Sequence, residues 1–258
     1  MGRYRSIAGT IMIVDLPPSA PFRPTRAVWS ASEPAVLIHQ IEEMVVRGHV
    51  HYADAKAGNL EAAAALVQDT LNDEIIVALS ELGLHRPALL PVVAEEAEGT
   101  NAIPLSLAQH LGAALGWRVE TGVIQANVAS RTKKDGYYRL AIQPVFDGPV
   151  ATEEQYVLID DFIGQGATLA NLRGHVMAGG GRVSGITSLT GKDVSATLAL
   201  RLGTLQELRR IHDDNLENWW WKVFGFGFEH LTESEARYII RRTDADRVRK
   251  EILARFRE

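Results

Sequence analysis

From about residue 87 onward the chain alternates short apolar runs with segments of helical pattern, and this alternation limits the possible folds more than any other feature. Residues 89–94, 156–159 and 183–189 have the pattern of buried strands, and residues 104–115 and 168–178 that of the helices between them. Strands that alternate with helices are typical of a parallel sheet covered by helices, because each parallel connection needs a crossover. We therefore expect an α/β fold with a parallel sheet flanked by helices.

The segments on either side of this alternation are expected to be mainly helical. The proline-rich residues 1–30 predict an extended or loosely packed arm. Apolar residues recur at helical spacing from Glu33 to Gly83, and helical patterns return after about Ser195. Two further strands are expected at residues 118–126 and 138–146, and Thr232 with Glu235 predicts a capping box. The expected organisation is an arm and helical extension (1–86), an α/β core (87–192) and a helical, Trp-rich C-terminal extension (193–258).

Composition excludes several classes of chemistry. The chain contains no cysteine, which rules out disulfides, thiolate metal sites and a cysteine nucleophile. Its 258 residues carry a net charge of −5, so nothing global favours a nucleic-acid or anionic-membrane partner. The apolar runs fall far short of the roughly 20 residues of a membrane helix, and a weak signal-peptide pattern over residues 3–14 stops at Asp15. We expect a cytoplasmic protein that does not bind membranes.

One segment has the pattern of a ligand site. A buried strand ends in Asp160 and Asp161, and a loop with Gly164 and Gly166 then opens a helix near Thr168. Glycines allow successive backbone N–H groups and the helix N-terminus to surround a phosphate. Carboxylates accept hydrogen bonds from the two hydroxyls of a ribose. The segment therefore predicts a site for a sugar phosphate.

The residues from Val157 to Thr168 (VLIDDFIGQGAT) resemble the 13-residue signature of the type I phosphoribosyltransferases, with Gln165 in place of the usual first threonine. The resemblance implies that Asp160 and Asp161 bind the ribose hydroxyls of phosphoribosyl pyrophosphate (PRPP), directly or through Mg²⁺. It further implies that the loop after them holds the 5′-phosphate. The PRPP-binding residues that it implies are Asp160, Asp161, Phe162, Ile163, Gly164, Gln165, Gly166, Ala167 and Thr168.

Two more loops correspond to the family's order of elements. The pyrophosphate loop would be formed by Ala94, Glu95 and Glu96. These glutamates either approach the diphosphate through Mg²⁺, which prefers oxygen ligands, or belong to a solvated acidic loop. The mobile catalytic loop would supply Arg131, Lys133 and Lys134 to offset the charge of the leaving pyrophosphate.

The resemblance implies a phosphoribosyltransferase that uses Mg²⁺ and transfers the phosphoribosyl group of PRPP to a nucleobase-like nitrogen acceptor, with release of pyrophosphate. Gly164 stands where enzymes acting on 6-oxopurines carry an aspartate, which disfavours such acceptors. The acidic first loop and Gln165 favour an alternative, a PRTase-type protein that binds PRPP or a nucleotide as a regulator or interaction module. A weaker similarity links the chain to the ComF-like branch, which is associated with DNA uptake. We also expect a homo-oligomer.

Other features are weaker. Residues 185–192 (GITSLTGK) lack the glycine spacing of a P-loop, and His49 with His51 lack further partners for a metal site. The segment 51–59 (HYADAKAGN) is either a helix entry or part of a substrate site, and we favour the first. Adjacent residues of Trp219–Trp221 cannot share one helix face, so one ring is expected to meet a ligand or a partner subunit unless all three pack on the core. The basic segment 237–258 could contact nucleic acid, although a solvated face is expected.

Overall fold

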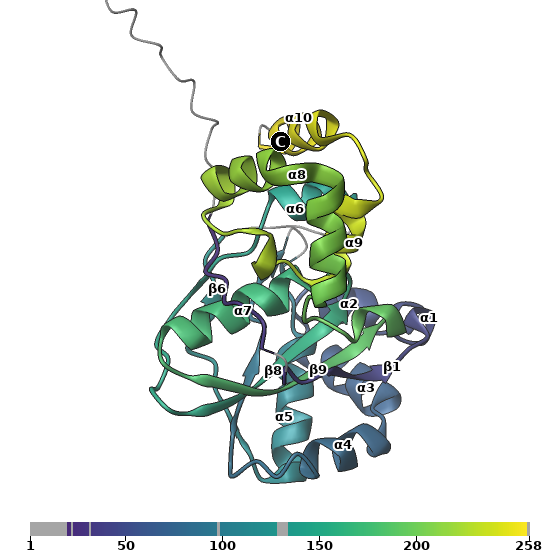
Figure 1. Cartoon of the computed structure of the whole chain (residues 1–258). Coiled ribbons are helices and arrows are strands. Elements are labelled where there is room, and N and C mark those ends of the chain that lie inside the picture. Colours follow the sequence, from purple (N-terminus) through teal and green to yellow (C-terminus); the bar gives the residue numbers. More distant parts are fainter. Residues whose placement is uncertain (1–19, 22, 31, 97–98, 128–133, 257–258) are drawn as a thin grey trace, which may run out of the picture.

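The computed structural model describes residues 20–21, 23–30, 32–96, 99–127 and 134–256. A five-stranded sheet lies at its centre in the order β1-β9-β8-β2-β5, and every neighbouring pair is parallel (Figure 1). Its strands are β1 (Val36–Gln40), β2 (Ala88–Pro91), β5 (Arg118–Val119), β8 (Gln155–Ile163) and β9 (Arg182–Gly191). The predicted fold class, a parallel sheet flanked by helices, is confirmed.

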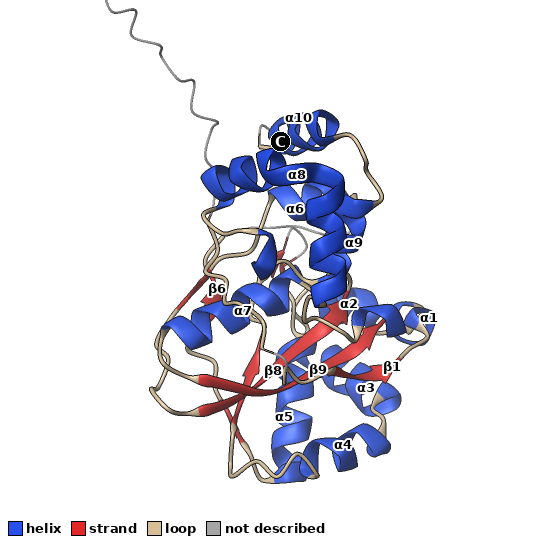
Figure 2. Ribbon diagram, in the orientation of Figure 1, coloured by secondary structure: helices blue, strands red, loops and turns tan. Residues whose placement is uncertain are grey.

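Helices cover both faces of the sheet because successive side chains of a strand point to opposite faces. Tyr156 and Leu158 of β8 belong to one apolar core, which α7 (Ala167–Ala178) completes. Val157 and Ile159 of the same strand belong to a second core on the other face (Figure 2). The helices with residues in this second core are α1 (Glu43–Arg47), α2 (Tyr52–Lys56), α3 (Leu60–Thr70), α4 (Asp73–Ser80) and α5 (Ile103–Leu115).

A third apolar core joins the C-terminal helices to one helix from the middle of the chain. Its members lie on α6 (Gly136–Ala141), α8 (Leu202–Phe224), the 3-10 helix η2 (Phe228–His230), α9 (Glu233–Ile240) and α10 (Ala245–Arg255). Trp220 is fully buried in it, whereas Trp221 is 60% exposed. Trp220 therefore fixes the C-terminal helices to each other, but the exposed ring of Trp221 shows that the three rings do not all pack on the core, and a contact of that ring with a ligand or partner subunit stays a prediction. The capping box of Thr232 and Glu235 is confirmed.

Two short antiparallel pairs and a 3-10 helix complete the described elements. They are β3 (Glu95–Glu96) with β4 (Gly99–Thr100), β6 (Ile124–Gln125) with β7 (Phe146–Asp147), and η1 (Asp193–Ser195). None of the helices in the described residues has the length and apolar character that crossing a bilayer needs. The segment compared with a P-loop lies almost entirely in strand β9, so it does not form a phosphate-binding loop.

Two local predictions are wrong. Residues 36–40, expected in a helix, form the edge strand β1 and pair with Ile186 to Thr190 of β9. Residues 138–146, expected as a strand, contain most of helix α6. The side chain of Asp135 caps α6 by accepting the backbone N–H of Tyr138 at 2.7 Å. In each case contacts outside the segment override a short pattern that suits either structure.

The described part of the arm before β1 contains no helix or strand, in keeping with the prediction of an extended or loosely packed segment, but it is anchored to the fold at individual residues. It crosses α7 at Gly174, where a Cβ atom would lie 2.1 Å from the carbonyl oxygen of Thr25. Arg26 forms an ion pair of 2.9 Å with Glu235 of α9, and both side chains are almost fully buried. The arm thus connects α7 to the C-terminal helices.

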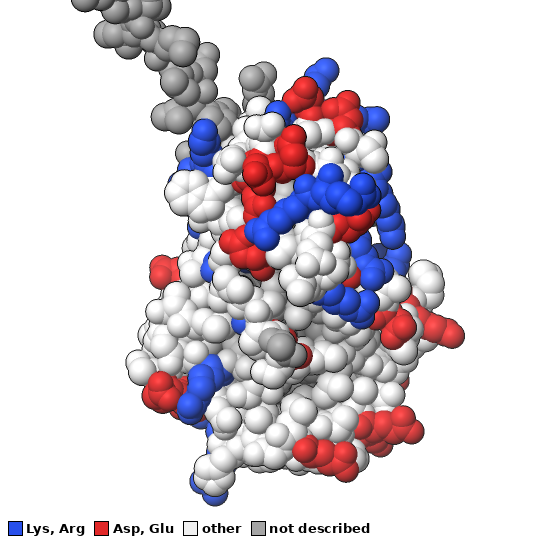
Figure 3. Space-filling view, viewed as in Figure 1, with Lys and Arg blue, Asp and Glu red and all other residues white. Residues whose placement is uncertain are grey.

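Acidic and basic side chains are interspersed over the C-terminal helices on the face that Figure 3 shows. On α10, Arg249 pairs with Asp246 at 2.8 Å, and Arg255 pairs with Asp135 at 2.9 Å. Carboxylates therefore offset part of the basic charge of this segment. The expected solvated face stays a prediction, and contact with nucleic acid stays its alternative.

Candidate functional site

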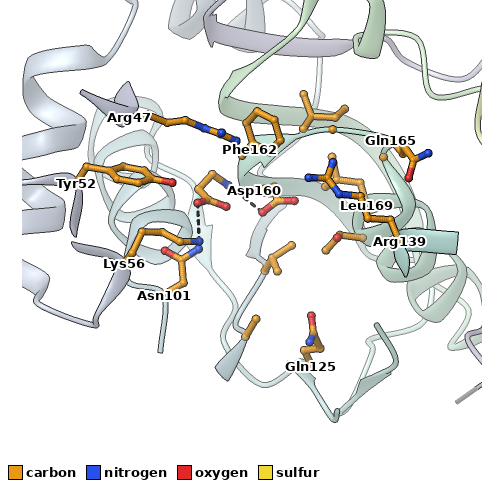
Figure 4. Close-up of a pocket in the computed structure, with 17 residues that line it drawn as sticks. Arg47, Tyr52, Lys56, Asn101, Gln125, Arg139, Asp160, Phe162, Gln165 and Leu169 are labelled. Carbon is orange, nitrogen blue, oxygen red and sulfur yellow. Dashed lines mark hydrogen bonds and ion pairs between the residues drawn. The ribbon is translucent and has the colours of Figure 1, made fainter. Parts of the chain in front are cut away.

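The predicted sugar-phosphate segment opens into a cavity of about 430 Å³ at the carboxyl end of β8 (Figure 4). Ligands of open α/β sheets bind at this edge, where the loops after the strands meet. The cavity is lined by Arg47, Tyr52, Lys56, Val92, Ala94, Asn101, Gln125, Arg139, Asp160, Asp161, Phe162, Ile163, Gly164, Gln165, Gly166, Thr168 and Leu169. Two carboxylates, three cations and a glycine loop therefore share one space.

The two aspartates lie side by side near the end of β8, a strand flanked by β9 and β2. They are 6% and 8% exposed, and the backbone N–H of Asp161 donates to Oδ1 of Asp160 at 2.9 Å. Lys56 donates from Nζ to Oδ2 of Asp161 at 3.1 Å. The pairing of β8 with both neighbours holds the carboxylates in place before any ligand arrives.

The surroundings push the pKa values of the two carboxyl groups apart. Burial, and then the charge of Asp161, raise the pKa of Asp160 well above its usual range. Burial alone would also raise the pKa of Asp161, but Lys56 and a hydrogen bond with Asn101 outweigh it and hold that pKa below its usual range. Asp161 is therefore the charged acceptor, and Asp160 holds a proton more readily than an ordinary aspartate.

The loop after β8 ends at the N-terminus of α7, whose N-cap residue is Gly166 and so has no side chain to cap the helix. Gly166 has φ +80°, and a Cβ there would lie 2.2 Å from Cδ2 of Leu198, so only glycine fits. The hydroxyl of Thr232 donates to the carbonyl oxygen of Gln165 at 2.6 Å and holds the loop from the other side. The loop and the helix N-terminus provide the partial positive charge that a phosphate needs.

Three cations reach the cavity from three different helices. Arg47 of α1 lies over the ring of Phe162, with 4.2 Å between its Cζ and the ring centroid. Lys56 of α2 contacts Asp161, and Arg139 of α6 lies beside Gly164, where a Cβ would be 2.8 Å from its Nη1. Arg47 is missing from the sequence-based site because helix α1 reaches the cavity only through the fold.

The residues predicted from the signature have different places in the structure. Asp160 to Gly166 and Thr168 all line the cavity, whereas Ala167 is buried as the first residue of α7. Ala94 of the predicted pyrophosphate loop also lines it. The backbones of Glu95 and Glu96 form β3, and their side chains lie outside the description.

Of the three residues predicted in the catalytic loop, the structure describes one, and it does not line the cavity. Arg131 and Lys133 lie outside the described residues. Lys134 is exposed, with its Nζ 4.4 Å from the ring centroid of Tyr138, and does not line the cavity. The cation that this part of the chain does place in the cavity is Arg139, five residues later.

Helix α2 belongs to the site rather than serving only as a helix entry. Tyr52 and Lys56 both line the cavity, and their spacing of four residues places them on one face of the helix. The backbone N–H of Ala102 donates to the carbonyl oxygen of Ala55 at 3.1 Å, and Gly99 passes so close that a Cβ would lie 2.6 Å from the carbonyl oxygen of Ala57. The spacing within HYADAKAGN was the available signal for this pair.

The carboxylates fit Mg²⁺ only if the metal arrives with a substrate. No group of three His, Cys, Asp or Glu side chains that could hold a metal exists in the described part of the chain, and Lys56 competes for Asp161. Mg²⁺ commonly uses one or two carboxylates together with substrate phosphates and water. Asp160 and Asp161 suit that arrangement. The two histidines considered as ligands, His49 and His51, are outside the cavity, and His49 contacts Asp69 at 3.2 Å.

Comparison with known proteins gives no family assignment, because no family model matches the chain. Protein TraN of Escherichia coli is 34% identical over 204 residues, which cover 79% of this chain and 46% of that protein. An uncharacterised protein of Haemophilus influenzae is 37% identical over 153 residues, which cover 59% of this chain and 34% of that protein. The chain thus spans less than half the length of either curated relative.

Two solved structures show weak similarity. An adenine phosphoribosyltransferase matches with a TM-score of 0.31 and 13% identity, covering 48% of this chain and 73% of that one. The UMP synthase of Leishmania donovani matches with a TM-score of 0.30 and 12% identity, covering 69% of this chain and 35% of that one. At these scores the function has to be argued from the cavity itself.

Proposed function

We propose that the chain binds PRPP and transfers its 5-phosphoribosyl group to a nitrogen acceptor, with release of pyrophosphate. The observation that carries the proposal is that a buried carboxylate pair and a helix N-terminus with glycine as its N-cap residue face one cavity. A carboxylate pair repels phosphate and a helix N-terminus attracts it. A ligand that satisfies both must carry hydroxyls on one part and a phosphate on another, as a ribose 5-phosphate does.

The pKa values of the carboxyl groups suit a vicinal diol. Asp161, kept ionised by Lys56 and Asn101, can accept a hydrogen bond from a ribose hydroxyl. Asp160, whose pKa is raised, can also donate its proton to a hydroxyl oxygen. Both groups are held by β8, so they orient the sugar at little entropic cost.

The reaction breaks the bond between the anomeric carbon and the pyrophosphate oxygen and forms a bond from that carbon to the acceptor nitrogen. The leaving pyrophosphate takes both bonding electrons, and the anomeric carbon passes through a state with oxocarbenium character. Arg47 and Lys56 are placed to offset the departing negative charge in a partly enclosed site. Mg²⁺ bound to the pyrophosphate would neutralise further charge when present. No protein nucleophile is needed, because the acceptor nitrogen attacks directly.

A second candidate is a binding module that senses PRPP or a nucleotide without turnover. The observation that favours it is the ion pair of 3.1 Å between Lys56 and Asp161, which occupies a carboxylate that the sugar would use. Such a protein would release its ligand unchanged. The expected homo-oligomer stays a prediction in both cases.

One assay separates these candidates. The chain is incubated with PRPP, Mg²⁺ and a panel of nitrogen acceptors, and PRPP binding and pyrophosphate release are measured together. The transferase predicts release that depends on one acceptor, whereas the module predicts binding without release for every acceptor. The double variant Asp160→Asn/Asp161→Asn should lose PRPP binding, and Asp147→Asn, a change at an exposed carboxylate of β7, should keep it. Absence of PRPP binding by the unmodified chain contradicts both candidates.

A further inference from the structure

The phosphate loop has no cation of its own. The segment from Phe162 to Leu169 contains neither lysine nor arginine. A phosphate held by the backbone of this loop would carry close to two negative charges, which the partial charge of a helix N-terminus offsets only in part. Any full positive charge next to the phosphate would come from another element, and Arg139 of α6 is beside the loop.

Arg139 is near enough to determine which residue the loop can contain. A Cβ added to Gly164 would lie 2.8 Å from Nη1 of Arg139, so the guanidinium occupies the space that a side chain at this position would need. Arg139 also lines the same cavity as Gln165 and Thr168. In Figure 4, Arg139 and Gln165 lie on one side of the cavity, and Lys56 and Asn101 lie on the other. The guanidinium therefore faces the phosphate end and not the diol end.

The C-terminal helices hold α6 rigidly. Asp135, the N-cap of α6, also accepts a hydrogen bond of 2.9 Å from Arg255 of α10. The rings of Tyr137 and Tyr238 pack edge to face, with centroids 5.4 Å apart. Gly136 lets Tyr238 approach so closely that a Cβ would lie 2.1 Å from Cε2 of that ring. The backbone that carries Arg139 is thus fixed by α9 and α10.

The net effect of the surroundings on Arg139 favours an anion at this place. Burial, and then the positive charge of Arg47, lower the pKa of the Arg139 guanidinium, and the carboxylates of Glu43 and Asp135 offset this only in part. Two guanidinium groups that repel each other across one cavity are both stabilised when an anion binds between them. Arginine also matches phosphate oxygens with two parallel N–H donors.

We infer that Arg139 clamps the 5′-phosphate against the α7 N-terminus and so selects phosphorylated over unphosphorylated ribose. The C-terminal helices serve the site by holding this guanidinium in position. The inference rests on the proposed function, since it assigns one end of the PRPP site. Arg139 is a binding and specificity residue in this scheme and takes no part in bond cleavage.

Calorimetric titration with two fragments of PRPP tests the inference. Ribose 5-phosphate probes the phosphate end, and pyrophosphate with Mg²⁺ probes the other end. In Arg139→Gln the affinity for ribose 5-phosphate should fall about tenfold or more, the usual scale for a charged hydrogen bond, while pyrophosphate affinity stays within about threefold. Arg139→Lys should regain part of the loss, because it restores the charge without the paired donors. Arg247→Gln, which changes an exposed arginine of α10, is the matched control and should bind as the unmodified chain does.

Each outcome decides something different. If Arg139→Gln binds ribose 5-phosphate within twofold of the unmodified chain, or loses both fragments equally, the inference is wrong and the proposed function stands. If the unmodified chain binds neither PRPP nor ribose 5-phosphate, the proposed function fails, and this inference fails with it. Should Arg139→Gln not fold, Arg139→Met replaces it, because methionine keeps much of the apolar length of the side chain and removes the charge. An Arg139→Met protein that retains full affinity for ribose 5-phosphate would then overturn the inference.

Discussion

Acid should destabilise this protein through one buried histidine, His39 of β1. Its side chain is 3% exposed, and its Nδ1 accepts the backbone N–H of Asn72 at 3.2 Å, just before α4 begins. Burial lowers the pKa of His39 from 6.5 to about 4. Between pH 6.5 and about pH 4 the unfolded chain binds a proton at His39 that the folded chain does not bind. The stabilising effect of a neutral His39 is therefore complete above pH 6.5 and is lost as the pH falls toward 4.

The size of this effect follows from the pKa difference. A shift from 6.5 to about 4, at 1.36 kcal/mol per pKa unit, corresponds to a loss of about 3 kcal/mol in the free energy of unfolding. No discount for solvent is needed, because the side chain is 3% exposed. Against a typical total of about 5–15 kcal/mol, this loss alone would markedly lower the midpoint of unfolding.

Urea unfolding at pH 7 and at pH 4, followed by circular dichroism, measures the effect in a variant comparison. His39→Asn keeps a hydrogen-bond acceptor for Asn72 and removes the titrating group. Its free energy of unfolding should fall by about 3 kcal/mol less than that of the unmodified chain over this pH range. Carboxyl groups titrate in both proteins and cancel in the difference. His85→Asn, a change at an exposed histidine, should follow the unmodified chain. An equal loss in His39→Asn and the unmodified chain would refute the reasoning.

Two further substitutions test how the C-terminal helices are held. Arg26→Met leaves Glu235 buried without its ion-pair partner and should cost about 3–5 kcal/mol in urea unfolding. Arg182→Met breaks an exposed pair with Glu153 and should cost less than about 1 kcal/mol, so similar losses would contradict a structural role for the arm. Trp220→Ala empties a fully buried position and should cost about 3–5 kcal/mol. Trp221→Ala should stay within about 0.5 kcal/mol, and a large loss there would point to a contact on the exposed ring.

The strand, loop and helix from β8 to α7 could be predicted because their determinants are local. The apolar run, the paired aspartates and the glycines that allow the turn all lie within about 15 consecutive residues, from 156 to 169. The structure forms α7 over Ala167–Ala178, close to the predicted 168–178, whereas β8 over Gln155–Ile163 begins one residue before the predicted strand 156–159 and extends four residues beyond it. A short motif of this kind specifies its own backbone path and the edge of the sheet that it reaches.

The cations could not be predicted, because they reach the cavity from distant parts of the chain. Lys56 precedes its partner Asp161 by 105 residues, and the docking of α2 against β4 and the residue before α5 brings them together. The sequence predicts the cations in the basic run 131–134, where charged residues are dense. Arg139 stands alone in a segment that was expected to be a strand, and the helical form of α6 is what turns it toward Gly164.

The error at β1 has a different origin. Val36–Gln40 begins with three apolar residues close to a proline, and a run this short suits a helix as well as a strand. Pairing with β9 stabilises the strand over the helix, and hydrogen bonds from threonine hydroxyls of β9 stabilise it further. Thr187 donates to the carbonyl oxygen of Leu37 at 2.8 Å, and Thr190 donates to that of Gln40 at 2.6 Å. A partner 150 residues away is outside the reach of a local pattern.

The C-terminal helices support the site without lining the cavity, and the capping box of α9 connects them to the phosphate loop. The Thr232 hydroxyl accepts the backbone N–H of Glu235 and also donates to the carbonyl oxygen of Gln165, so one side chain caps α9 and fixes the phosphate loop. The carboxylate of Glu235 in turn binds both the Thr232 backbone and Arg26 of the arm. Loss of α9 would thus release the loop, the arm and the support of α6 together. For that reason the binding of a sugar phosphate should be lost along with the C-terminal helices, even though every residue of the signature lies before them.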